Sequence, residues 1–146
     1  QECRKNLPVD IAIFAAAVSD WKCSEARNTK IKKSSEGDNL TINLQQNQDI
    51  LKEISTLNNN RPKLVIGFSL ETDNLIESAK KKLKNKSCDW IIANGHHNGE
   101  ESVFDSEMNS IKLIDNNNVE DWGYLNKNDI AEKICIKISK FFNEAA

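Results

Sequence analysis

The segment VDIAIFAAAVSDW (residues 9–21) decides the fold class of this chain. Its first ten residues are almost continuously apolar, which is typical of a strand buried on both faces of a parallel sheet. Three alanines, Ala15–Ala17, then replace the bulky side chains that fill a core, and Asp20 and Trp21 follow. We expect either that a ligand approaches the backbone closely at the alanines or that they pack against a neighbouring helix.

Hydrophobic periodicity predicts the remaining elements. Buried strands are predicted at 63–69 and 88–94, a half-buried strand at 40–44 and an edge strand at 110–115, with helices at 49–57, 73–86 and 129–142. Asn126 or Asn128 is a candidate N-cap for the last helix. Residues 19–39 are predicted to be a long loop, 95–109 a second loop and 116–128 a turn-rich segment.

Strands that alternate with helices indicate an α/β fold with a largely parallel sheet. We predict a three-layer sheet of the Rossmann-like or ribokinase-like class. The opening CRKNLP resembles the tail of a crossover helix, and the chain has no initiator Met. We therefore expect that the sheet lacks its N-terminal strands.

Length and composition restrict the class of protein. A chain of 146 residues suits one domain, 1–146. The net charge of −2 argues against nucleic acid as a partner, and no apolar run approaches the ~20 residues of a membrane span. The four cysteines form no C-x-x-C, and the N-terminus has no apolar signal-peptide core. We expect free thiols and a cytoplasmic protein.

Ligands of open parallel sheets bind beyond the carboxyl ends of the strands. AAAVSD, GFSLET and IIANGHHN follow the three predicted buried strands. Asp20 could hold a ribose hydroxyl or a metal-bound water, or it could cap a turn. Phe68 could pack against a base, or it could belong to the core.

Lysines are the candidate phosphate ligands. Lys82 and Lys86 lie four residues apart and flank the apolar stripe of the predicted helix, whereas Lys81 and Lys84 point to the opposite side. Their ammonium groups could reach an anion at the strand ends or snorkel into solvent. A basic cluster in the predicted loop 19–39 could clamp phosphates or form a solvated surface: Lys30, Lys32 and Lys33.

Other site motifs find little support. Adjacent residues rarely bind one ion, so His96 and His97 make a poor metal site. The sequence contains no G-x-G-x-x-G, no G-x-x-x-x-G-K-[ST] and no G-x-S-x-G. A dinucleotide enzyme or a serine hydrolase therefore has no positive motif here.

Six motifs, taken in order, resemble the phosphopantothenate–cysteine ligase domain of bacterial coenzyme A biosynthesis. They are AAAVSDW, KIKK, NQDIL, GFSLET, KKKLKNKSCDWIIAN and MNSIKLI. The resemblance runs from about residue 7 to the end. In many bacteria this domain is the C-terminal half of a bifunctional protein whose N-terminal half is a flavin-dependent phosphopantothenoylcysteine decarboxylase. FMN would belong to that half, which is absent from this chain.

The resemblance implies a reaction between 4′-phosphopantothenate and cysteine. CTP, with Mg²⁺, first activates the pantothenate carboxylate as an acyl-cytidylate and releases pyrophosphate. The cysteine amine then attacks the acyl group and CMP leaves. Stabilising charge on the phosphates is mainly electrostatic work. A homodimer is also implied.

Carried over by position, the nucleotide contacts would be Phe14, Ala15, Ala16, Asp20, Lys30, Asn47, Gln48, Asp49, Ile50, Phe68, Lys82 and Lys86. Lys30 would also act in catalysis, as the first lysine of a loop that closes over the triphosphate and the intermediate. The resemblance supplies no magnesium ligands.

The sequence departs from the family pattern at several positions. Lys22 stands where many relatives have Arg, Gln48 replaces a proline, and Gly95 replaces an aspartate. FSLET stands in place of FAAET. The family's glycine-rich opening turn, its phosphopantothenate site and its catalytic asparagine would lie upstream, so we expect these 146 residues alone to be inactive.

Two alternatives remain open. The first is a non-catalytic nucleotide-sensing or interaction module on the same half-sheet, and the second is an unrelated α/β enzyme such as a short oxidoreductase. Comparing CTP with ATP would separate the first from a ligase, and a nicotinamide titration would test the second.

Overall fold

The computed structural model describes residues 1–25, 29–30, 40–71, 74–95 and 107–144. Its contacts divide the chain into two compact units. The larger unit comprises Gln1–Ala15 and Leu51–Ala146, and the smaller unit comprises Ala16–Ile50.

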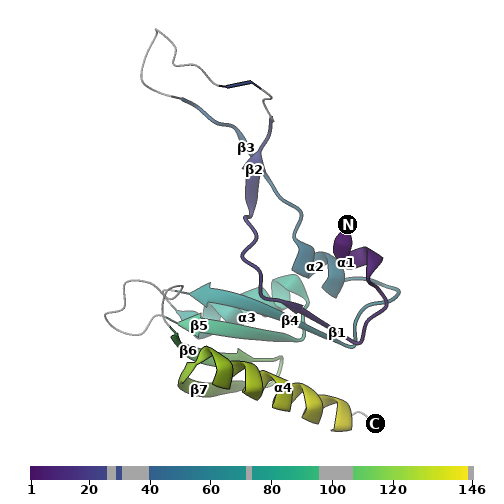
Figure 1. The fold of residues 1–146 in the computed structure, drawn as a ribbon, viewed down its shortest axis with the longest axis vertical. Coiled ribbons are helices and arrows are strands. Elements are labelled where there is room, and N and C mark those ends of the chain that lie inside the picture. The colour runs from purple at the N-terminus through teal and green to yellow at the C-terminus, as the bar shows by residue number, and fades with distance from the viewer. Residues whose placement is uncertain (26–28, 31–39, 72–73, 96–106, 145–146) are drawn as a thin grey trace. The chain divides into compact units, whose positions relative to one another are not determined.

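The larger unit is built on a five-stranded mixed sheet in the order β1-β4-β5-β6-β7 (Figure 1). Strands β1 (Ile11–Phe14), β4 (Leu64–Glu71) and β5 (Trp90–Gly95) are parallel. Strands β6 (Met108–Ile114) and β7 (Val119–Asn126) extend the sheet as antiparallel neighbours. The Rossmann-like α/β class predicted from the sequence is thereby confirmed.

Helices cover both faces of this sheet and make three layers. They are α1 (Glu2–Lys5), α2 (Ile50–Ser55), α3 (Leu75–Lys86) and α4 (Lys127–Glu144). Ala79 and Leu83 of α3 pack against one face of the sheet, which includes Val65 and Ile91. Ile130 and Ile134 of α4 pack against the opposite face.

The face under α4 carries the bulkier core. Alternate residues of β4 and β5, among them Ile66, Trp90 and Ile92, point to this side. The rings of Trp90 and Phe141 meet edge to face with centroids 5.6 Å apart. Because the side-chain period of a strand is two, β4 and β5 are apolar on both faces, as their continuous apolar runs predict.

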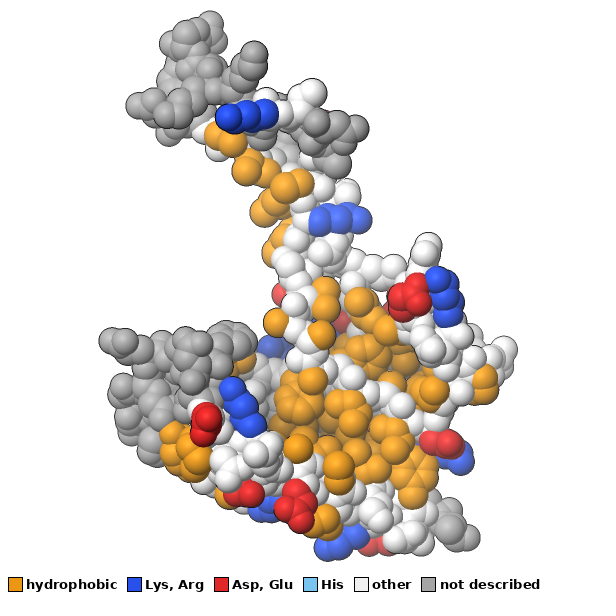
Figure 2. Space-filling view, viewed as in Figure 1, with side chains coloured by type: hydrophobic (Ala, Val, Ile, Leu, Met, Phe, Trp, Pro, Cys, Tyr) orange, Lys and Arg blue, Asp and Glu red, His pale blue; other side chains and the backbone are white. Residues whose placement is uncertain are grey.

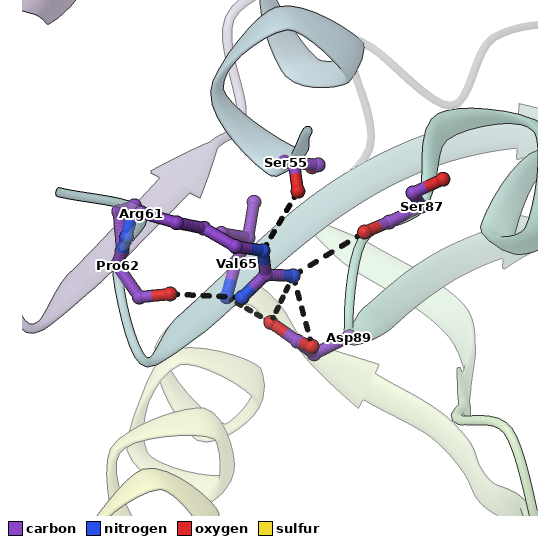
Figure 3. A network of polar contacts seen from close by, with 6 residues as sticks. All are labelled: Ser55, Arg61, Pro62, Val65, Ser87 and Asp89. Carbon is purple, nitrogen blue, oxygen red and sulfur yellow. Dashed lines mark hydrogen bonds and ion pairs between the residues drawn. The ribbon is translucent and has the colours of Figure 1, made fainter. Parts of the chain in front are cut away.

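An Arg61–Asp89 clasp joins four segments at the amino ends of β4 and β5 (Figure 3). Arg61 Nη2 donates to both carboxylate oxygens of Asp89, at 3.0 and 3.1 Å. Arg61 Nε donates to the Ser55 carbonyl at 2.7 Å, and Nη2 also reaches the Ser87 carbonyl at 3.3 Å. The Val65 amide donates to Asp89 Oδ2 at 2.7 Å. The ends of α2 and α3 are thus tied to the sheet.

The smaller unit contains an antiparallel ribbon of β2 (Trp21–Cys23) and β3 (Leu44–Gln46). The Asn47 amide donates to the Asp20 carbonyl at 2.8 Å and continues the pairing beyond the strands. Trp21, Cys23 and Leu44 share one face of the ribbon, and all three are exposed. Figure 2 shows hydrophobic side chains along this part of the chain.

The first predicted strand is shorter than expected. β1 ends at Phe14, and residues 15–18 are exposed and outside any strand. Methyl side chains bury little apolar area, so a run of alanines gives a strand little packing energy. Neither packing on a helix nor a core position is therefore found for the alanines. The predicted loop 19–39 also includes β2, whose three residues gave too short a pattern.

Three other expectations about strands were wrong. Residues 40–44 are exposed, and their alternation belongs to the ribbon of the smaller unit rather than to a half-buried strand. Strand β6 is not an edge, because β7 pairs with it along its length. The segment 116–128 was predicted to be turn-rich, yet most of it is β7, in which Gly123 adopts a φ of 75° beside a register shift.

The helices follow the predicted periodicity closely. Asn126 is confirmed as the cap of α4, because its Oδ1 accepts the Asp129 amide at 2.8 Å. All four cysteines are free thiols, as expected. None of the helices among the described residues has the length and apolarity needed to cross a membrane.

Candidate functional site

The carboxyl ends of the parallel strands define the candidate site of the larger unit. Phe14, the last residue of β1, is in register with Gly67, so β4 continues for four residues beyond β1, from Phe68 to Glu71. On the other side, Glu71 is in register with Gly95 of β5. Residues 68–71 of β4 therefore pair with β5 on one side and extend past the end of β1 on the other.

Two glycines allow close packing beneath this edge. A methyl group on Gly67 would lie 2.6 Å from Leu51 Cδ2 and 3.0 Å from Ile91 Cδ1. A methyl group on Gly95 would lie 2.7 Å from Leu75 Cδ1. Glycine at these two positions lets α2 and the first turn of α3 approach the strands.

Phe68 lies on the α4 side of the sheet and packs against the core there. The residue is half-buried, so its packing against the core leaves it partly accessible. Phe14 also packs against a core, on the α3 side. Phe68 thus belongs in part to the core, as one of the two interpretations of the sequence expected. Its contact with a base stays a prediction.

The placement of the α3 lysines agrees with the helical-wheel prediction. Lys82 and Lys86 are half-buried at the border of the apolar stripe, whereas Lys81 and Lys84 are exposed. Lys82 Nζ lies 2.7 Å from Glu71 Oε1, and this ion pair brings its ammonium group to the end of β4. The roles of Lys82 and Lys86 toward an anion stay predictions.

Sequence reasoning missed the polar side chains of the strand ends. Glu71 is only 13% exposed although it is charged. Ser69 Oγ and Asn94 Oδ1 are buried without a hydrogen-bond partner among the described residues. The signal was available in GFSLET: the side-chain period of two places Ser69 and Glu71 on the same face as Gly67, toward α3.

The smaller unit brings two predicted site residues together. Besides the Asn47 amide bond to Asp20, Asn47 Nδ2 donates to the Ser19 carbonyl at 2.8 Å. Asp20 and Asn47, which are 27 positions apart in the sequence, therefore lie side by side. The Asp20 carboxylate is exposed, and it caps no backbone group in the described part of the chain.

The other predicted residues of this unit are placed as follows. Lys30 and Gln48 are exposed, while Asp49 and Ile50 are half-buried. Lys32, Lys33, His96 and His97 lie outside the described residues.

The thiol with a perturbed pKa lies away from the strand ends that form this site. Burial raises the pKa of the Cys88 thiol to about 11, so it stays protonated and unreactive near neutral pH. Cys88 is buried just before β5, at the end of the sheet opposite to Glu71.

The part of the chain that the structure describes contains no group of three His, Cys, Asp or Glu side chains that could bind a metal ion. Mg²⁺ commonly uses one or two carboxylates together with substrate phosphates. Asp20 is an exposed carboxylate of this kind.

An open, partly parallel α/β sheet with polar side chains along its carboxyl edge defines a domain of the Rossmann-like class. The family model for the DNA/pantothenate metabolism flavoprotein C-terminal domain matches residues 1–142. The chain belongs to this family.

Relatives in sequence and structure agree with that assignment. The coenzyme A biosynthesis bifunctional protein CoaBC of Haemophilus influenzae is 39% identical over 71% of this chain, and that of Borreliella burgdorferi is 38% identical over 86%. The chain spans 25% and 30% of those proteins. The crystal structure of a CoaBC C-terminal domain matches with a TM-score of 0.69 and 26% identity, over 98% of this chain and 59% of that one.

Proposed function

We propose that this chain is the CTP-binding part of a phosphopantothenate–cysteine ligase that works in coenzyme A biosynthesis in the cytoplasm. The observation that carries the proposal is the position of Lys82. Its ammonium group lies at the end of β4, where open α/β sheets bind ligands. The names of the CoaBC relatives support the same pathway.

The proposed reaction has two steps. A carboxylate oxygen of 4′-phosphopantothenate attacks the α-phosphorus of CTP, and the bond to pyrophosphate breaks. The cysteine amine then attacks the acyl carbon of the acyl-cytidylate, CMP leaves with the bonding electron pair, and the nitrogen loses a proton to solvent as the amide forms. Both steps need cations on the phosphate oxygens, since negative charge collects there in the transition states.

Separate residues would take separate parts of the nucleotide. Lys82 and Lys86 supply ammonium groups from α3. The role of Lys30 in nucleotide binding rests on the family resemblance alone. Phe68, which is half-buried, would pack against the base. Asp20, fixed by the Asn47 bonds to its backbone and to that of Ser19, accepts hydrogen bonds from the ligand.

Backbone groups complete the proposed base and ribose contacts. The exposed Ala15 and Ala16 leave their backbone open to a close approach. Asn47–Ile50 form a second proposed contact segment, which the family resemblance implies, and Phe14 ends the strand before the alanines.

We also propose that two copies pair through the apolar face of the ribbon. Trp21 and Leu44 are 56% and 55% exposed, which is costly for large apolar side chains on one face. Leu44→Asp would place a charge in that face. We expect sedimentation velocity to show a dimer for the unchanged chain and a monomer for the variant; a monomer in both cases contradicts the dimer.

Calorimetry with Mg²⁺ tests the function directly. We expect CTP to bind at least about tenfold more tightly than ATP, equivalent to about 1.4 kcal/mol. Lys82→Ala and Lys86→Ala should each weaken CTP binding, and Lys81→Ala and Lys84→Ala, on the exposed side of the same helix, serve as matched controls. Equal affinity for the two nucleotides, or equal losses in all four variants, would count against the ligase.

A further inference from the structure

The Glu71–Lys82 ion pair places an anion beside the proposed phosphate site. It joins the last residue of β4 to the third turn of α3, with 2.7 Å between Lys82 Nζ and Glu71 Oε1. The side chain of Glu71 is 13% exposed and that of Lys82 is 43% exposed. The carboxylate side chain is thus largely shielded from water, whereas the lysine side chain is accessible to a ligand.

This geometry differs from that of a lysine that merely extends into solvent. Lys80, Lys81 and Lys84 of the same helix are exposed, whereas Lys82 is directed to the strand end. An ammonium group has three N–H donors. One carboxylate oxygen does not use all of them, so Lys82 can contact Glu71 and a phosphate oxygen at the same time.

A carboxylate so close to a phosphate-binding ammonium acts on the phosphate charge as well. Metal-free CTP carries two more negative charges than its complex with Mg²⁺. Because Glu71 is largely shielded from water, mobile ions screen its field less than that of a surface carboxylate. Repulsion from Glu71 therefore falls mainly on the metal-free nucleotide.

We propose that Glu71 is a specificity-determining residue that makes the site favour metal-bound over metal-free nucleoside triphosphate. This inference rests on the proposed function, since it takes Lys82 as a triphosphate contact. Two charges spread over a triphosphate at an average of about 8 Å from a carboxylate change an affinity by about fivefold even at the dielectric constant of water, which is a lower limit for a shielded carboxylate.

Calorimetric titration with CTP, once with Mg²⁺ and once with EDTA, measures this preference as the ratio of the two dissociation constants. Glu71→Gln keeps the size of the side chain and an oxygen facing Lys82, and it removes the charge. Glu77→Gln is the matched control, because Glu77 is an exposed carboxylate in the first turn of α3. Thermal unfolding of each variant reports any loss of folded protein. Such a loss affects the titrations with Mg²⁺ and with EDTA equally, so it does not change the ratio of their dissociation constants.

We expect the EDTA-to-Mg²⁺ ratio to shrink by about fivefold in Glu71→Gln and to change by less than about twofold in Glu77→Gln. A Glu71→Gln variant that binds CTP with an unchanged ratio overturns the inference and leaves the proposed function standing. An equal change in both variants overturns it too. Failure of the unchanged chain to bind CTP under either condition overturns the proposed function together with the inference.

Discussion

Replacing Asp89 by Asn should destabilise the larger unit far more than the same replacement at Asp10. Both carboxylate oxygens of Asp89 accept hydrogen bonds from Arg61 Nη2, and Oδ2 also accepts one from the Val65 amide. Asparagine offers one carbonyl oxygen and an NH₂ group, so one N–H donor would face another. The guanidinium of Arg61 would also lose its counterion.

The magnitude follows from the burial of the pair. Breaking a fully buried ion pair costs about 3–5 kcal/mol. Arg61 and Asp89 are 27% and 31% exposed, so water partly compensates, and we take about 2 kcal/mol. With a urea dependence of about 2 kcal/mol per molar, the unfolding midpoint should fall by about 1 M.

Urea unfolding followed by tryptophan fluorescence measures that midpoint, since Trp90 and Trp122 are both buried in the larger unit. Asp10→Asn is the control. Asp10 pairs with Lys63 at 3.0 Å, the same distance as in the clasp, but both side chains are about 70% exposed. We expect less than about 0.5 kcal/mol there. Similar midpoints for the two variants would refute the claim that burial gives the clasp its strength.

Three further predictions concern packing, pH and thiol chemistry. Gly67→Ala should cost about 1–3 kcal/mol, because its methyl group would meet Leu51 Cδ2 at 2.6 Å, and adding Leu51→Ala should recover part of that loss; urea midpoints that simply add would contradict the contact. The hydrogen bond from Lys137 lowers the pKa of Glu120, so its contribution is present above the unfolded pKa and is lost as pH falls through the folded pKa. The stability advantage of the unchanged chain over Glu120→Gln should therefore shrink from pH 6 to pH 3, and a constant advantage would argue against the bond. At pH 8 a thiol reagent should modify the exposed Cys3, Cys23 and Cys135 promptly and Cys88 only after unfolding, because burial raises the pKa of Cys88 to about 11; four equally fast thiols would disprove its burial.

The central sheet could be predicted because its strands carry strong local signals. KLVIGFS and CDWIIAN are apolar on both faces, and the α3 stripe of Ala79 and Leu83 follows the helical period. The borderline position of Lys82 and Lys86 could be derived from the same wheel. These features depend on neighbours within one turn or one strand, which a sequence displays directly.

The remaining elements depend on partners distant in the chain. Strand β7 contains Gly123 and two charged residues, Glu120 and Asp121, and it becomes a strand because β6 pairs with it. The three residues of β2 are likewise stabilised by β3 across the ribbon. The Glu71–Lys82 pair could not be predicted from spacing, since it requires the end of β4 to lie beside the third turn of α3. Such contacts are properties of the tertiary fold.

Lysine acetylation in the presence and absence of Mg²⁺–CTP, read by mass spectrometry, tests the central claim most directly. If a triphosphate binds the ammonium groups of Lys82 and Lys86, CTP should protect these two lysines, and Lys81 and Lys84 should react at unchanged rates. Equal protection of all four lysines, or of none under conditions where CTP is bound, would contradict the proposed site.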